Sequence, residues 1–176
     1  MRVLGLMALS SVLLGCATQG VSHTELPSYY MAADPQTRLS QYVAKEQPAD
    51  ESLSGFTLLY KGNDALAARL KLIDMADQSL DIQYYIFNTD ITGGLIAEHL
   101  LKAADRGVRV RILLDDIGSS LEDMKVAVVD QHPNVEVRLY NPLSLRNEWL
   151  KSLSTLGEFG RINYRMHNKL MVADNR

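Results

Sequence analysis

The feature that most constrains the fold is a pair of alternating apolar segments joined by a helical stretch. In residues 80–86, apolar side chains at every second position alternate with polar ones, as in a half-buried strand. Residues 108–114 repeat this alternation, and the stretch 92–106 between them predicts a helix closed by Gly107 in a left-handed cap. A connection of this length lets two strands run parallel, whereas a short hairpin would not.

The same strand–helix alternation continues on both sides of this unit. A helix is predicted over 64–76, with apolar residues at helical spacing, and another over 119–131, opened by a capping box. Strands are predicted over 135–140 and 169–174. The chain is therefore predicted to be an α/β protein with a mixed or mainly parallel sheet and helices on both faces.

The N-terminus, "MRVLGLMALSSVLLGC", reads as an export signal over residues 1–15. The only cysteine of the chain, Cys16, follows it at the position where bacterial lipoproteins carry their lipid-modified cysteine. We expect cleavage before Cys16 and acyl chains that hold the protein at a membrane, facing the periplasm. Ala17, in place of an aspartate, favours the outer membrane. A plain signal peptide with an incidental cysteine is the alternative.

Residues 16–54 are polar and contain three prolines, so they are predicted to form a tether with one short helix near 36–45. The folded domain is predicted over 55–176. Outside the leader, no stretch is apolar enough to span a bilayer. A net charge of −3 argues against a broad nucleic-acid surface, which would normally be basic.

Reactive side chains gather in "RMHNKLMVADN". His167 and Lys169 lie two residues apart at a strand entry, so their side chains share one face. An imidazole can attack phosphorus, and an ammonium can offset the charge on phosphate oxygens. The offset of Asp174 suits it to holding backbone or a neighbouring strand. The alternative is a histidine at a strand entry beside a solvated lysine. The other histidines are predicted bystanders: His23, His99 and His132.

The segments "SLDIQYYIF", "VRVRILLDD", "VEVRLYNP" and "RMHNKLMVADN", in this order, closely resemble the phospholipase D superfamily, and most of all its bacterial cardiolipin synthase branch. The resemblance covers residues 55–176. It implies the first half of a fold built from two similar halves, whose His-x-Lys-x4-Asp motifs meet at one site without metal or cofactor. By this resemblance His167 would be the nucleophile or the acid that protonates the leaving alcohol. Lys169 would hold the phosphate, and Asp174 would be a supporting residue.

The resemblance implies a phosphatidyltransferase that makes cardiolipin from phosphatidylglycerol, or a similar phospholipid, through a phosphohistidine intermediate. Its partners would be the phospholipid and the membrane, with no nucleic acid. An exported phosphodiesterase or nuclease of the same superfamily is an alternative, as is a non-catalytic, membrane-tethered lipoprotein. Because the sequence stops two residues after Asp174, we expect an incomplete, inactive fragment that needs a second half-domain. Family members with one motif can instead build the site across a homodimer.

Overall fold

The computed structural model describes residues 28–46, 52–117, 131–142, 160 and 163–176. The chain divides into two units, Met1–Tyr30 and Met31–Arg176, and each is considered by itself. The second unit holds all the helices and strands described below. The predicted signal peptide, Cys16, His23 and most of the helix predicted over 119–131 lie outside the described residues.

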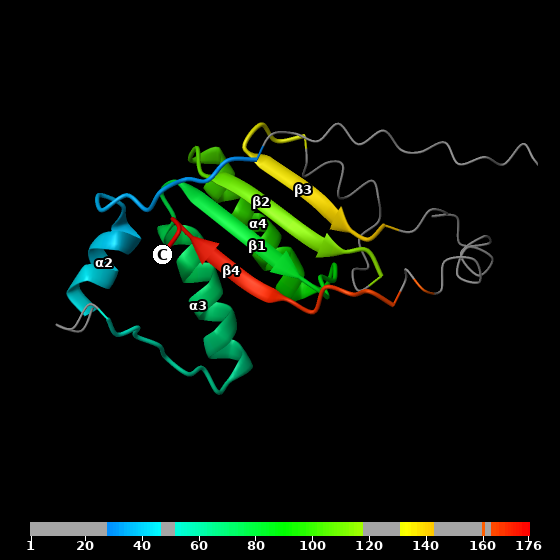
Figure 1. The fold of residues 1–176 in the computed structure, drawn as a ribbon, viewed down its shortest axis with the longest axis horizontal. Coiled ribbons are helices and arrows are strands. Elements are labelled where there is room, and N and C mark those ends of the chain that lie inside the picture. Colours follow the sequence, from blue (N-terminus) through cyan, green and yellow to red (C-terminus); the bar gives the residue numbers. More distant parts are fainter. Residues whose placement is uncertain (1–27, 47–51, 118–130, 143–159, 161–162) are drawn as a thin grey trace, which may run out of the picture. The chain divides into compact units, whose positions relative to one another are not determined.

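A four-stranded mixed sheet forms the centre of the second unit, in the order β3-β2-β1-β4 (Figure 1). The strands are β1 (Ser79–Tyr84), β2 (Arg109–Asp115), β3 (Val135–Tyr140) and β4 (Lys169–Ala173). The first three run parallel, and β4 runs antiparallel to β1. The prediction of an α/β protein with a mixed sheet is thus confirmed.

The register aligns the apolar alternation of neighbouring strands. Leu80 pairs with Val110 and Ile82 with Ile112, so the apolar side chains of β1 and β2 share one face of the sheet. On the other side of β2, Val110 pairs with Val135. The last strand ends one residue earlier than predicted. The N–H of Asp174 still donates to the carbonyl oxygen of Ser79 at 2.8 Å, but its φ of 51° departs from strand geometry.

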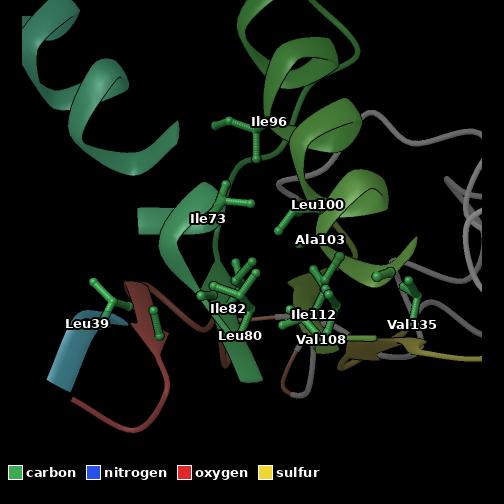
Figure 2. Close-up of a cluster of buried hydrophobic side chains, with 14 of the residues drawn as sticks. Leu39, Ile73, Leu80, Ile82, Ile96, Leu100, Ala103, Val108, Ile112 and Val135 are labelled. Atoms are coloured by element: carbon green, nitrogen blue, oxygen red, sulfur yellow. The ribbon is translucent and has the colours of Figure 1, made fainter. Parts of the chain in front are cut away.

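Two helices, α3 (Gly62–Met75) and α4 (Ile91–Asp105), pack against each other and against the same face of the sheet (Figures 1 and 2). Asp90 caps α4 by accepting from the backbone N–H of Gly93 at 2.8 Å. Gly107 ends it at a φ of 94°, in the left-handed region that was predicted. In the described residues, α3 and α4 cover one face of the sheet, and most of the third predicted helix, over 119–131, lies outside those residues.

The hydrophobic core fills the space between these two helices and the sheet (Figure 2). Helix residues in it include Ile73, Leu100 and Ala103, and the strands contribute the side chains that the alternation predicts. The strand residues of the core are Leu80, Ile82, Val110, Ile112, Leu114, Val135 and Ala173. Local periodicity assigns these residues to one face of each strand. Burial of that face therefore determines which side of each strand points towards α3 and α4.

Part of the segment interpreted as a polar tether belongs to the folded unit. Helix α2 (Arg38–Glu46) begins after Thr37, whose hydroxyl accepts from the backbone N–H of Ser40 at 3.2 Å. Leu39 is 5% exposed and joins the hydrophobic core, which is why this stretch is not a free tether. Polar contacts hold it to the rest of the unit: Arg38 with Asp77, Gln78 with Asp34, Asn175 with Met31, and Arg176 with Ser40.

The contact between Arg38 and Asp77 makes stability depend on pH. The hydrogen bond from Arg38 lowers the pKa of Asp77 below its usual value of 3.8. A lowered pKa contributes stability that is complete above 3.8 and is lost as the pH falls through the folded-state pKa. Because the Asp77 side chain is 32% exposed, its ion pair contributes little. We expect Asp77→Asn to lower the free energy of unfolding, measured in urea, by about 0.5–1 kcal/mol at pH 6 and by much less at pH 2.5.

Arg38→Met provides the matched variant for this test. It should lose at least as much stability at pH 6, because Arg38 also donates to the carbonyl oxygens of Asp74 and Ala76, and the double variant should lose no more than Arg38→Met alone. If wild type and Asp77→Asn differed by the same free energy of unfolding at both pH values, the contact between Arg38 and Asp77 would not be the source of the pH dependence.

Candidate active site

The predicted reactive pair lies at the carboxyl edge of the parallel strands. Lys169 begins β4 and pairs with Tyr84, the last residue of β1, because β4 runs antiparallel to β1. His167 lies two residues before Lys169, and the side chains of His167 and Lys169 are exposed. In α/β sheets, ligands bind outside the carboxyl ends of the strands. The structure thus brings His167 and Lys169 together at the edge where such sites form.

A tyrosine joins the two residues into one cluster. The Tyr85 ring lies 4.2 Å from the His167 ring, between centroids, with 41° between the planes. The Lys169 ammonium lies 5.2 Å from the centroid of the same ring and donates to the carbonyl oxygen of His167 at 2.7 Å. We call Tyr85, His167 and Lys169 the His167 cluster. Sequence reasoning missed Tyr85, which it treated only as a strand residue of the "QYYIF" segment.

A buried carboxylate holds the backbone just before His167. Asp115, at the end of β2, is fully buried and accepts from Arg165 Nη1 at 3.0 Å and from the backbone N–H of Met166 at 3.1 Å. A buried charge is tolerated only when it is paired and hydrogen-bonded, and Asp115 meets both conditions. The residue directly before His167 is therefore tied to the end of β2.

The end of β3 supplies a second tie to the same segment. The Asn141 side chain donates to the carbonyl oxygen of Tyr164 at 3.0 Å, and Arg165 Nη2 donates to the Asn141 carbonyl oxygen at 3.4 Å. Asn141 has a φ of 50°, a conformation that asparagine tolerates better than most residues. The sequence assigned Asn141 only to the end of a strand. One feature of the sequence could have predicted these contacts, namely the two acidic residues Asp115 and Asp116 at the end of an apolar strand.

Asp174, the third residue of the motif, lies at the opposite end of β4. Its carboxylate is 1% exposed and accepts from the backbone N–H groups of Asp77, Gln78 and Ser79 at 2.8–3.1 Å. At a strand rise of about 3.3 Å per residue, it is separated from Lys169 by roughly 16 Å. The side chain therefore joins β4 to the start of β1, as its offset suggested, and does not reach the His167 cluster.

The other described histidines pair with carboxylates away from this cluster. His99 Nδ1 lies 2.7 Å from Asp74, and His132 Nε2 lies 3.3 Å from Asp105. Among the described residues, no group of three or more His, Cys, Asp or Glu side chains is placed to hold a metal ion. The exposed imidazole of His167 beside the Lys169 ammonium has a clear chemical use, namely attack on, or protonation at, a phosphate ester.

Comparison with known proteins agrees with this chemistry. The family model described as "Cardiolipin synthase, PLD-like domain" matches residues 70–176. Cardiolipin synthase C of Escherichia coli (strain K12) is 48% identical over 120 residues, which is 68% of this chain and 25% of that protein. An uncharacterized protein of Helicobacter pylori (strain ATCC 700392 / 26695) is 39% identical over 156 residues, 88% of this chain and 31% of that protein.

Among solved structures, NucT from Helicobacter pylori is 26% identical, with a TM-score of 0.46 over 67% of this chain and 65% of that one. The chain spans about a quarter to a third of the length of the curated relatives it matches. The family model, in contrast, covers more than half of this chain, from α3 through the His167 cluster to Arg176. The chain therefore belongs to the phospholipase D-like family and is related to the cardiolipin synthases.

Proposed function

We propose that this chain is part of a phosphatidyltransferase of the cardiolipin synthase type, acting on the phosphodiester bonds of phospholipids. The observation that carries the proposal is the pairing of His167 and Lys169 at the carboxyl edge of the sheet. The sequence around that pair belongs to a chain that is 48% identical to a cardiolipin synthase over 120 residues. The substrate would be phosphatidylglycerol or a similar phospholipid.

In the proposed reaction, one histidine attacks the phosphorus of phosphatidylglycerol, and the bond from phosphorus to the glycerol headgroup breaks. A second, protonated histidine gives its proton to the departing glycerol oxygen. A hydroxyl group of another phosphatidylglycerol then attacks the phosphohistidine and gives its proton to the second histidine; the phosphorus–nitrogen bond breaks, which frees the first histidine and forms cardiolipin. Lys169 offsets the negative charge on the phosphate oxygens. His167 supplies one of the two imidazoles, and a second half-domain would supply the other.

A chimera tests the reaction. The 120-residue segment of E. coli cardiolipin synthase C that matches this chain would be replaced by the corresponding residues of this chain. The purified chimera and the 176-residue chain would each be given phosphatidylglycerol vesicles or plasmid DNA. The proposal expects cardiolipin and free glycerol from the chimera. Cleavage of the plasmid without cardiolipin would favour the phosphodiesterase alternative, and no product from either substrate would favour the non-catalytic one.

We further propose that the protein is a lipoprotein, anchored through Cys16 and facing the periplasm, with the outer membrane favoured. Support comes from the apolar leader that ends at the single cysteine, and from the bilayer location of the proposed substrate. No helix in the described ranges is long and apolar enough to cross a membrane. An acyl anchor would hold the enzyme beside its lipid.

Replacing the anchor residue should release the protein from membranes. We expect Cys16→Ser to abolish lipid labelling with radioactive palmitate and to move the protein out of the membrane fraction after a high-salt wash. Ala17→Asp is the matched control, because it changes the neighbouring residue and retains the cysteine. This control should stay membrane-bound and shift towards the inner membrane. If Cys16→Ser stayed in the membrane fraction, and stayed unprocessed to the same extent as wild type, the proposal that the protein is a lipoprotein would be wrong.

A further inference from the structure

One aromatic ring contacts both chemically active side chains of the site. The half-buried Tyr85 ring lies 4.2 Å from the His167 imidazole and 5.2 Å from the Lys169 ammonium. Among the described residues, neither side chain makes a hydrogen bond, ion pair or ring contact with any other side chain. Tyr85 is therefore the side chain that can restrict where the imidazole and the ammonium lie before a substrate arrives. The carbonyl oxygen of His167, 2.7 Å from the ammonium, adds a backbone contact to Lys169.

The backbone explains why Tyr85 occupies this place. Its N–H donates to the carbonyl oxygen of Asn168 at 3.1 Å, which extends the β1–β4 ladder one step beyond the Tyr84–Lys169 pair. Tyr85 consequently lies opposite the motif. The adjacent Tyr84 belongs to the helix side, because its hydroxyl accepts from Arg69 of α3 at 2.9 Å and its ring packs edge-on against Phe87. Two neighbouring tyrosines thus have distinct surroundings.

The contacts have a direct physical effect on the motif. An ammonium within about 6 Å of an aromatic centroid is attracted by the negative face of the ring. Ordering a lysine side chain costs up to roughly 2 kcal/mol of rotamer entropy, and a contact present before binding offsets part of that cost. A ring packed on the imidazole likewise limits its rotamers. Holding reactive groups near their reacting positions is one of the main sources of enzymatic rate enhancement.

We propose that Tyr85 is a positioning residue that holds the His167 imidazole and the Lys169 ammonium side by side for phosphodiester chemistry. The role in turnover rests on the proposed function, whereas the positioning itself does not. The hydroxyl group of Tyr85 is not needed for either ring contact. Tyr85→Phe should therefore behave like wild type, and Tyr85→Leu should not.

The positioning is tested by NMR on the complete 176-residue chain in detergent micelles, with labelled histidine and tyrosine. His167→Gln identifies the His167 ring signals. We expect a nuclear Overhauser effect between the Tyr85 and His167 rings and a ring-current displacement of the His167 signals. Tyr85→Leu should lose that displacement, Tyr85→Phe should keep it, and the matched control Tyr84→Leu should keep it as well. Absence of the Overhauser effect in the wild-type chain, or an unchanged His167 signal in Tyr85→Leu, would overturn the proposal.

Turnover is tested in the chimera described above. Misplacement of reacting groups by about 1 Å can cost on the order of a hundredfold in rate, so we expect Tyr85→Leu to lower kcat roughly ten- to a hundredfold. KM should change little, and Tyr85→Phe should restore the rate. A wild-type kcat for Tyr85→Leu in an active chimera would also overturn the proposal. An inactive chimera would count against the proposed function alone, since the NMR result decides the positioning without it.

Discussion

His167→Ala in the chimera should lower cardiolipin formation at least about a hundredfold, the lower range for losing a positioned proton-transfer group. Either role of His167 predicts this loss, because both the attack on phosphorus and the protonation of the leaving alcohol need an imidazole. The side chain is exposed at the edge of the sheet and contributes nothing to the hydrophobic core. The thermal melt of the variant should therefore match that of the unsubstituted chimera.

His132→Ala is the matched control for this experiment. His132 is also a histidine near a strand end, but it pairs with Asp105 and belongs to a different part of the unit. We expect its removal to leave turnover near that of the unsubstituted chimera. Turnover by His167→Ala at the rate of the unsubstituted chimera would remove His167 from the mechanism.

Asp174→Ala should lower the free energy of unfolding, measured in urea, by about 3 kcal/mol or more. The substitution leaves three backbone N–H groups, those of Asp77, Gln78 and Ser79, without their carboxylate acceptor. Each buried donor left unsatisfied costs roughly 1–3 kcal/mol. Ser79 is 2% exposed, so water offers little replacement at that position. The loss reflects how Asp174 joins β4 to the start of β1.

Two further variants separate this structural role from a catalytic one. Asp174→Asn keeps an acceptor oxygen and should cost less than Asp174→Ala. Asp105→Ala removes an aspartate whose side chain is 71% exposed and should change stability little. If Asp174→Ala unfolded like wild type but inactivated the chimera, Asp174 would act on the substrate instead of on the backbone.

Local sequence determined most of the secondary structure of the second unit. The alternation of apolar residues predicted β1, β2 and β3, because a strand buried on one face must repeat every second residue. Gly107 predicted the end of α4, because few other residues adopt a positive φ at low cost. The pair His167 and Lys169 was found in the same way, since a two-residue spacing in extended backbone places both side chains on one face.

The tertiary structure decided which distant residues complete these elements. Asp115 reaches Met166 across 51 residues, and Asp174 reaches Gln78 across 96. Tyr85 meets His167 only because β4 pairs with β1 in one particular antiparallel register. Leu39 enters the core from a segment that composition alone describes as polar. Periodicity reports which face a side chain occupies, but register and docking depend on contacts between segments far apart in sequence, and those are settled only when the chain packs.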